Sequence, residues 1–434
     1  MKLLCLVWIV GVIFTFVSET ASMLIIGKAI KGVAIGVAFA TVPTYLFEII
    51  PYKRRARMLT LFTFFWALGT LFMFLLPIAC SGHLHGRRYL NFHCLVDLVP
   101  LSFSTIAVLF VPESPKWLAG NNKWTNAADV LESIESKNSG NLEKTKTHSE
   151  RVKLGDKHFV VKKYSTTMDI KSCNLNALFG RKYIKEISLG ILLQLFVDCM
   201  GVKVLVESLG YICSACQVSS IDELRMVQMF DLLVRCLFAI VPLLILDNMR
   251  RKDVFMFGVA MIALCMCIYT IMFLGFSLKR PARSLLYFNS DWVSKVEFYD
   301  EKASLVLALT IVMDVLYNAL IVPSSWLIIL ENFSTSSRVR GWIVVSSSHW
   351  LFACSISLAY PFLLLHLNGW VLFVSTIFCT VGLILSLQIP ETKETAAPMV
   401  EVGRRQLCSD GGKTWETVPD SRPSRAKNRL GALP

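Results

Sequence analysis

The chain of 434 residues is poor in charge, because only 17% of its residues are Asp, Glu, Lys or Arg. A soluble domain has about 25%. Hydrophobic residues make up 54% of the chain, and the mean hydropathy is +0.56. These values exclude an ordinary soluble domain and predict a polytopic membrane protein.

The sequence also lacks the short motifs of common enzyme sites. It contains no nucleophile elbow, no phosphate-binding glycine loop, no HExxH and no paired-cysteine zinc motif. Cys213 and Cys216 have the spacing of metal ligands, but no second pair and no nearby His accompany them. We therefore expect a protein that is not an enzyme and that needs no cofactor or metal.

Acidic residues are scarcer than basic ones, 31 against 44, which gives a net charge of +13. In a membrane protein, an excess of Lys and Arg in cytoplasmic loops is the usual cause of such a balance. The basic clusters of this chain lie in short loops between apolar runs. Nucleic acid is therefore not expected as a partner.

Long apolar runs account for the hydrophobic excess. About 20 apolar residues cross a bilayer core, and backbone hydrogen bonding makes helices the form that such runs adopt. The sequence predicts an all-α polytopic membrane protein in a lipid bilayer, with about ten transmembrane helices. The predicted spans are 3–20, 24–47, 58–79, 93–111, 185–209, 226–246, 253–276, 304–330, 341–366 and 369–388.

The basic segments indicate the orientation of these helices. With ten crossings, the Lys- and Arg-rich segments all lie on one face, which is the cytoplasmic one, as are both termini. These segments are 51–57, 112–184, 247–253, 337–341 and 389–434. Within 112–184 we expect a short amphipathic helix around Trp117, Leu118 and residues 127–134, and mobile chain over 135–165. Disorder is expected after Ala396.

Two matched signals divide the chain into related halves. Glu48 precedes Arg55 by seven residues, as Glu331 precedes Arg338, and a Pro-Glu pair follows later in each half. These signals predict a bundle of four helices over 1–111, which the family resemblance given below implies is incomplete, and a cytoplasmic linker over 112–184. A six-helix bundle over 185–390 and a tail over 391–434 follow.

Several motifs resemble the sugar-porter branch of the major facilitator superfamily. They are Gly27–Gly32 with Val42–Glu48, Pro112–Lys116, Leu193–Phe196 before Gly201, Trp326–Glu331, His349–Trp350 and Pro390–Lys393. The resemblance implies a secondary transporter that moves a sugar or polyol across the plasma membrane by alternating access, with the proton as a candidate coupling ion. Matched by motif, the chain starts at the third of the family's twelve helices. A transport-incompetent relative, such as a nutrient sensor, is the alternative.

The resemblance also implies a cytoplasmic gate, in which acids after the fourth and tenth helices of the family pair with loop arginines. By position, the gate residues are Glu48, Arg55, Glu113, Asp247, Arg251, Glu331, Arg338 and Glu391. The alternative reading of the arginines is simple positive-inside anchoring.

Polar side chains inside spanning helices are costly and usually face a wet cavity or a partner. Matched to the family, the candidate substrate-binding residues are Thr63, Gln194, Asp198, Lys203, Arg235, Asn318, Trp326, His349 and Trp350. An alternative is that neighbouring charges neutralise one another, as Asp198–Lys203, Lys203–Glu207 and Asp231–Arg235. His349 is expected either to titrate or to pack through a hydrogen bond, and Lys31 to extend to the membrane surface.

Overall fold

The computed structural model describes most of the apolar part of the chain. The described residues are 2–50, 54–80, 87–120, 123, 125–127, 129–130, 133, 180, 183–216, 218, 220–275, 278–281, 294–297, 300–334, 337–367, 369–389 and 391–392. The segment 135–165 and the tail after Ala396, for which mobility and disorder were expected, lie outside them.

Each of the ten predicted apolar stretches is helical. The helices are α1 Lys2–Val17, α2 Ala21–Ile49, α3 Arg55–Cys80, α4 Arg87–Phe110, α10 Ile184–Cys199 with α11 Val202–Glu207, α13 Ile221–Phe238 with α14 Val241–Ile245, α15 Arg251–Gly275, α16 Asp300–Leu316 continuing through the π-helical turn η2 Tyr317–Ile321 into α17 Val322–Asn332, α18 Arg338–Leu367 and α19 Gly369–Ser386. Among the described residues, seven helical segments are long and apolar enough to cross a membrane, and three shorter apolar helices supply the other stretches. The predicted fold class is confirmed.

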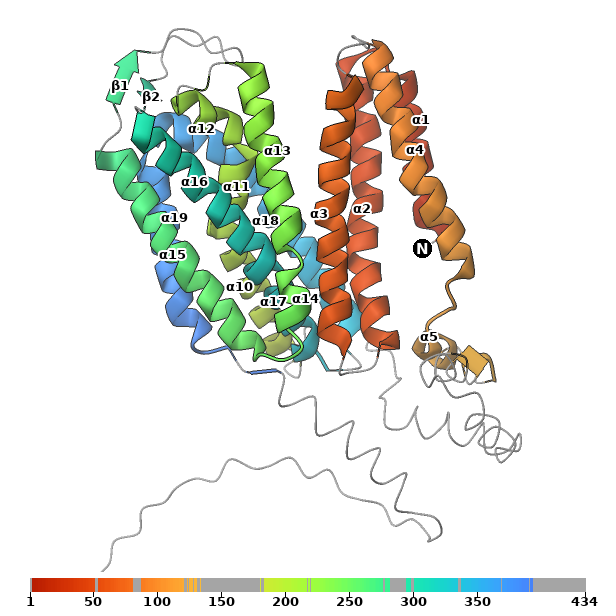
Figure 1. Ribbon diagram of the computed structural model, residues 1–434. Helices are drawn as coiled ribbons and strands as arrows, with labels where there is room; N and C mark the ends of the chain where they lie inside the picture. Colours follow the sequence, from red (N-terminus) through yellow and green to blue (C-terminus); the bar gives the residue numbers. More distant parts are fainter. Residues whose placement is uncertain are drawn as a thin grey trace, which may run out of the picture.

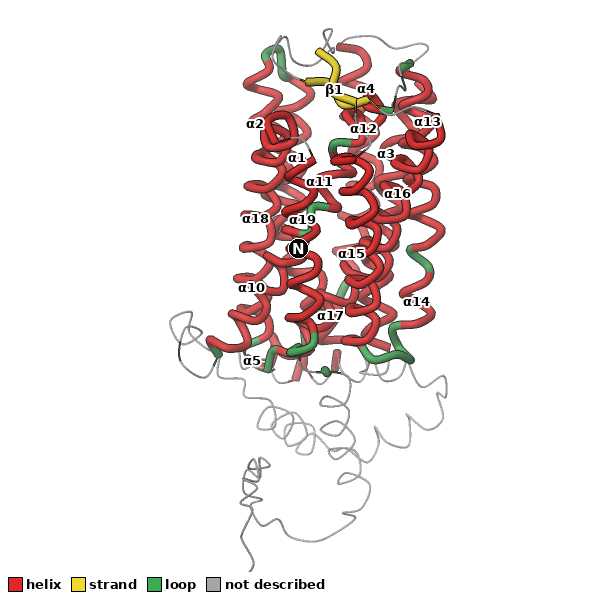
Figure 2. Tube along the Cα trace, turned by 90° about the vertical axis from the view of Figure 1, so that its left-hand side faces the viewer, coloured by secondary structure: helices red, strands yellow, loops and turns green. Residues whose placement is uncertain are grey.

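Four short elements lie at the ends of these long helices (Figures 1 and 2). Two are the helices α5 Pro115–Gly120 and α12 Leu209–Ala215, and two are the strands β1 Leu278–Pro281 and β2 Ser294–Glu297, which pair antiparallel with Leu278 opposite Glu297. The sequence did not predict this strand pair. In the expected amphipathic segment, α5 and the described residues 125–127, 129, 130 and 133 are helical, and Leu118 and Ala127 are buried.

The long helices form two groups that lie side by side (Figure 1). The first contains α1 to α4, and the second contains α10 to α19. The groups meet along two lines, where α2 packs against α18 and where α3 packs against α13, α14 and α17. Any site between these lines is therefore built from both halves of the sequence.

Within the first group, a mostly buried lysine lies beside a glycine. A Cβ on Gly11 of α1 would lie 2.6 Å from Lys31 Cγ of α2, so only glycine leaves room for the Lys31 side chain there. The Lys31 ammonium donates to the Asp97 carboxylate of α4 at 2.9 Å. The expectation that Lys31 extends to the membrane surface was wrong, because an ammonium inside a helix bundle is stabilised by a facing carboxylate.

The break between α10 and α11 depends on one residue. Gly201 has φ +77°, a left-handed conformation that disfavours any side chain. A Cβ there would also lie 2.7 Å from Ser375 Oγ. The break redirects the chain so that Gln194 of α10 and Lys203 of α11 can face the same cavity.

We predict that Gly201→Ala destabilises the folded protein by about 1–2 kcal/mol, because the left-handed conformation is higher in energy by that amount for an L-amino acid with a side chain. The matched control is Gly210→Ala, since no atom lies within 4 Å of a Cβ at Gly210. Thermal unfolding of both variants in detergent measures the effect. Equal midpoints for the two variants would contradict the strain at Gly201.

Candidate functional site

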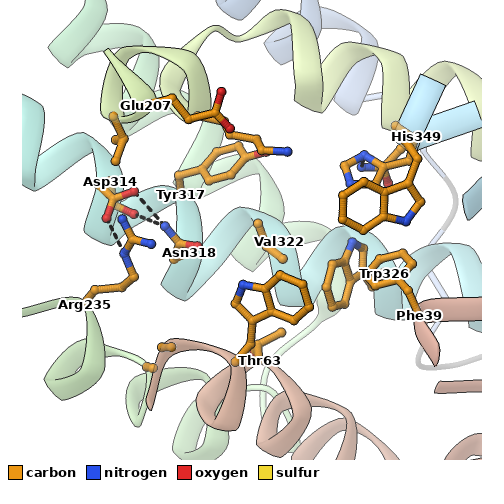
Figure 3. A pocket seen from close by; sticks show the side chains of 17 residues that line it. Phe39, Thr63, Glu207, Arg235, Asp314, Tyr317, Asn318, Val322, Trp326 and His349 are labelled. Atoms are coloured by element: carbon orange, nitrogen blue, oxygen red, sulfur yellow. Dashed lines mark hydrogen bonds and ion pairs between the residues drawn. The ribbon is translucent and has the colours of Figure 1, made fainter. Parts of the chain in front are cut away.

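A cavity lies between the two groups of helices and takes its walls from both. Its volume is about 1030 Å³ including the open mouth. From the first group come Phe39 of α2 and Thr63, Trp66 and Ala67 of α3. The second group supplies the rest, and Figure 3 shows Arg235, Asp314 and Asn318 on one side with His349 on the other.

Eight of the nine predicted substrate-binding residues line this cavity. They are Thr63, Gln194, Lys203, Arg235, Asn318, Trp326, His349 and Trp350. Asp198 does not line it, which corrects the expectation of direct contact with a substrate. Its side chain is 2% exposed, and its Oδ2 lies 3.0 Å from His349 Nδ1. Asp198 therefore acts on the cavity through the imidazole.

Aromatic rings gather around Phe39. Its ring lies edge-on to Trp326 at 4.7 Å between centroids and to Trp350 at 5.6 Å. His349 stacks on it at 5.9 Å with an interplanar angle of 27°. Phe39 belongs to the first helix group and the other three belong to the second, so the ring cluster joins the two groups within the cavity wall. Such ring pairs contribute about 0.5–1.5 kcal/mol each beyond the area they bury.

A proline creates a hydrogen bond between the groups beside this cluster. Pro43 has no N–H, so the carbonyl of Phe39, four residues earlier, has no intrahelical donor. Trp342 of α18 supplies the missing donor, because its Nε1 donates to Phe39 O at 3.2 Å. Trp342 is 1% exposed.

We predict that Trp342→Phe destabilises the folded protein by about 1–3 kcal/mol, because it leaves a buried carbonyl without a donor. The double variant Trp342→Phe with Pro43→Ala should recover part of this loss, since an alanine at position 43 can donate within α2. Thermal unfolding of the single and double variants in detergent tests the coupling. Additive losses would show that Pro43 and Trp342 act independently.

On the charged side of the cavity, side chains from α13, α16 and η2 form a network of hydrogen bonds and ion pairs. Arg235 Nε lies 2.6 Å from Asp314 Oδ2, and Arg235 Nη2 lies 3.2 Å from Asp231 Oδ2. The Asn318 amide donates to Asp314 Oδ1 at 2.8 Å. The expected pairing of Asp231 with Arg235 is thus present, and Asp314 is a second acid on the same guanidinium (Figure 3).

Lys203 and Glu207 have other partners than the sequence suggested. Lys203 Nζ lies 5.7 Å from the centroid of the Trp350 ring, and Glu207 accepts a hydrogen bond from Ser357 at 2.9 Å. Neither the Asp198–Lys203 nor the Lys203–Glu207 ion pair forms among the described residues. A cation over an aromatic face is itself stabilised.

An ion pair ties the two groups together at the end where α5 lies. Arg57 of α3 meets Asp247, which follows α14, at 3.1 Å between Nε and Oδ2. The Arg57 backbone N–H also donates to Asp247 Oδ1 at 3.2 Å. Asp247 was predicted as a gate residue, and its partner Arg57 belongs to the basic segment 51–57.

An aromatic sandwich forms a second tie at this end. The guanidinium carbons of Arg55 and Arg338 each lie 4.5 Å from the centroid of the Phe47 ring. Arg338 comes from α18 and the other two come from the first group. Its Nε and Nη2 donate to the carbonyls of Leu330 and Phe333, both at 3.0 Å, so Arg338 also caps the end of α17.

The remaining predicted gate acids act within one group. Glu331 lies 3.7 Å from Arg251 and accepts from the Thr392 hydroxyl at 2.6 Å. Glu391 accepts from the backbone N–H groups of Arg251 and Lys252, both at 3.3 Å, and so caps the first turn of α15. These contacts hold the start of α15, the end of α17 and the chain after α19 together.

The cysteines with metal-like spacing belong to no metal-ligand set in the described part of the chain. Among the described residues, no group of three His, Cys, Asp or Glu side chains could hold a metal ion. Cys213 and Cys216 are free and buried at α12. Burial raises the pKa of the Cys213 thiol to about 11 and the pKa of the Cys216 thiol to about 12, so both stay protonated at neutral pH.

Comparison with known proteins matches residues 1–400 to the family model "Sugar (and other) transporter". The chain belongs to the sugar (and other) transporter family. Members of this family are transporters and not enzymes, so the predicted resemblance and the expected absence of an enzyme activity are both confirmed. The chain is an integral membrane protein and a secondary transporter.

Several named transporters are similar to this chain. A high-affinity glucose transporter of Kluyveromyces lactis is 22% identical over 419 residues, which cover 95% of this chain and 72% of the relative. The facilitated glucose transporter member 3 of dog is 24% identical, over 88% of this chain and 70% of the relative. In structure, the xylose transporter XylE from E. coli, in a partially occluded inward-open conformation, has a TM-score of 0.64 at 14% identity, over 90% of this chain and 80% of that one.

In this transporter, one predicted gate residue makes no ion pair among the described residues, and several cavity residues were not predicted. Glu113 is exposed and makes no ion pair within the described part of the chain, because the turn before α5 directs the neighbouring Ser114 hydroxyl to Glu48 instead, at 2.6 Å. The predicted set of substrate-binding residues did not include nine of the residues that line the cavity. They are Phe39, Trp66, Ala67, Val206, Glu207, Ala239, Asp314, Tyr317 and Val322. The signal for Asp314 is a charged residue inside an apolar helix, four residues before Asn318, whereas the apolar wall residues carry no such signal.

Proposed function

We propose that this transporter carries a neutral polyhydroxylated solute, a sugar or a polyol, through the cavity between its two helix groups. The observation that supports this most is the wall itself. It combines aromatic faces with amide and hydroxyl groups, and both helix groups contribute to it. Sugars present apolar ring faces and many hydroxyls, so a site for them needs both kinds of side chain.

The charges of the cavity favour a neutral solute. The Arg235 guanidinium already faces Asp231 and Asp314. One further ammonium, Lys203, and one further carboxylate, Glu207, also line the cavity. Because the Arg235 guanidinium is already paired within the protein, the solute is held mainly by Gln194, Asn318 and Thr63 and by the aromatic rings of the wall. In this proposal Trp326 and Trp350 stack on the sugar.

The contacts that join the two helix groups at one end give this proposal its mechanism of alternating access. Arg57–Asp247 and the Phe47 sandwich join the groups there, and each tie has one partner from each group. Breaking them would let the groups separate at that end, so we assign them to the inner gate. Glu48, Glu331 and Glu186 are the acids near enough to interact with Arg338 electrostatically. Glu391 and Arg251 position the helices that carry these groups.

The placement in the cell follows from charge. The tied end carries the basic segments, so we place it, with both termini, on the cytoplasmic side of the plasma membrane. The relatives are named as transporters of glucose, and one of 31% identity over 29% of this chain is a galactose-proton symporter of Escherichia coli. Hexoses are therefore the first solutes to test, and the proton is the first coupling ion.

Counterflow tests the proposal. Purified protein in liposomes loaded with unlabelled glucose, galactose, xylose or inositol should accumulate the same labelled solute for a short time. Trp326→Ala should abolish this signal, because the stacking ring is lost. Failure of correctly folded protein to exchange any of the four solutes above empty liposomes would overturn the proposal and favour a protein that does not transport.

A further inference from the structure

His349 occupies a special place in the cavity wall. It is 9% exposed, it stacks on Phe39 of the opposite helix group, and its Nδ1 contacts two side chains of α10. The Gln194 Nε2 lies 2.8 Å from Nδ1, and Asp198 Oδ2 lies 3.0 Å from it. The imidazole thus links a cavity-lining amide, a buried carboxylate and the other half of the molecule.

The two contacts of Nδ1 require opposite protonation states. The Gln194 amide nitrogen can only donate, so Nδ1 must carry no proton to accept from it. The Asp198 carboxylate can only accept while ionised, so Nδ1 must carry a proton to donate to it. The proton on Nδ1 therefore decides which of the two contacts is a hydrogen bond.

The buried carboxylate gives this choice a direction. Asp198 Oδ1 has no hydrogen-bond partner among the described residues, and the side chain is 2% exposed. When Nδ1 is unprotonated, Oδ2 also lacks the imidazole as a donor. An ionised carboxylate in that position is costly, so uptake of a proton by the imidazole relieves the site.

Other charged groups face the imidazole at longer range. From α11 these are Lys203 and Glu207, and from η2 the phenol of Tyr317. Across the cavity lies the Asp231–Arg235–Asp314 network. The adjoining α19 contains no Asp, Glu, Lys, Arg or His, and α2 presents the Phe39 ring. Among the described residues, Asp198 is the acid in direct contact with His349.

We propose that His349 and Asp198 form a proton-binding site that couples the proton to the solute through Gln194; this inference rests on the proposed function. With the cavity open to one side, Nδ1 takes a proton from water there, and the resulting imidazolium donates to Asp198. The Gln194 amide N–H is then free to donate to a solute hydroxyl. When the cavity opens to the other side, the solute leaves, Nδ1 releases the proton to water, and Gln194 again donates to Nδ1.

The stack on Phe39 extends this coupling to the opposite helix group. A protonated imidazole over an aromatic face gains a cation–π attraction. Phe39 also accepts the hydrogen bond from Trp342 across the same boundary. Binding of the proton therefore strengthens a contact between the two groups while it frees Gln194 for the solute.

The test compares exchange with net transport in proteoliposomes. For the wild type, glucose added outside should drive proton uptake, read by a pH-sensitive dye inside, and the initial rate of net uptake should depend on pH. His349→Gln should lose the glucose-driven proton uptake and the pH dependence. The readout is the number of protons taken up per glucose, which a faster or slower exchange by itself does not change.

Asp198→Asn gives a second, independent test. Loss of the carboxylate removes the group that accepts from the protonated Nδ1, so this variant should take up fewer protons per glucose than the wild type. Ser348→Ala is the matched control, since its hydroxyl donates only to the Val345 carbonyl of its own helix. It should take up as many protons per glucose as the wild type.

The outcomes separate this inference from the proposed function. Wild-type protein that exchanges glucose without moving protons, or an Asp198→Asn variant that takes up as many protons per glucose as the wild type, would overturn the proton site and leave the transporter proposal standing. Wild-type protein without any exchange would instead overturn the proposed function. If His349→Gln does not fold, as shown by its thermal unfolding, the proton uptake per glucose of Asp198→Asn decides.

Discussion

Arg338→Glu is expected to destabilise the folded transporter by about 3–5 kcal/mol, because it replaces a buried, fully engaged cation by an unpaired anion. The wild-type residue is 8% exposed, donates to the carbonyls of Leu330 and Phe333, and packs on Phe47. A glutamate there would face those carbonyl oxygens with a negative charge. Thermal unfolding of the purified variant in detergent measures the loss.

The matched control is Arg57→Glu, at the same end of the molecule. The Arg57 side chain is 53% exposed, so its ion pair with Asp247 contributes at most about 1 kcal/mol to stability. This variant should unfold near the wild-type temperature and still change the rate of solute exchange, because it weakens a tie between the groups. The swap Arg57→Asp with Asp247→Arg should restore the rate. Similar unfolding temperatures for Arg338→Glu and Arg57→Glu would contradict the buried role of Arg338.

Arg235→Met is expected to cost about 3–5 kcal/mol as well, because it leaves two buried carboxylates without their shared cation. The Asp231 and Asp314 side chains are 6% and 3% exposed. Methionine keeps most of the volume and removes the charge, so the loss measures electrostatics more than packing. The readout is again thermal unfolding in detergent.

A charge-balanced variant serves as the control for Arg235. Arg235→Met combined with Asp231→Asn and Asp314→Asn has no buried ion in the network and should recover most of the stability. Arg235→Lys keeps the charge but cannot reach both acids in the same geometry, so it should fall between the two. If the triple variant is as unstable as the single one, the loss comes from packing and the electrostatic interpretation is wrong.

The predicted substrate-binding residues show how far sequence could go. Trp326 and Gln194 were placed in the cavity because their motifs match family positions, and the structure has them there. Asp198 was misplaced, since helical spacing brings it near Gln194 but does not reveal that His349, 151 residues away, takes its carboxylate. Phe39 was missed, because an apolar residue in an apolar helix carries no signal of its own.

The gate residues divide in the same way. The recurrence of Glu and Arg at a spacing of seven residues predicted two related halves of the chain. Glu331 does pair with an arginine. The expectation for the exposed Glu113 was wrong, because a turn of a few residues decides whether Glu113 or Ser114 faces Glu48. The pairing of Arg57 with Asp247 joins residues 190 positions apart, and no local pattern indicates such a partner.

The sequence by itself determined that the chain is a helical membrane protein, because apolar runs in lipid must satisfy their own backbone hydrogen bonds. Its motifs also identified the family and eight of the residues that line the cavity. Only the tertiary structure decided which acid pairs with which base, which ring stacks on His349 and which side chain donates to the Phe39 carbonyl. Those choices depend on contacts between helices distant in sequence, which packing sets and local periodicity does not.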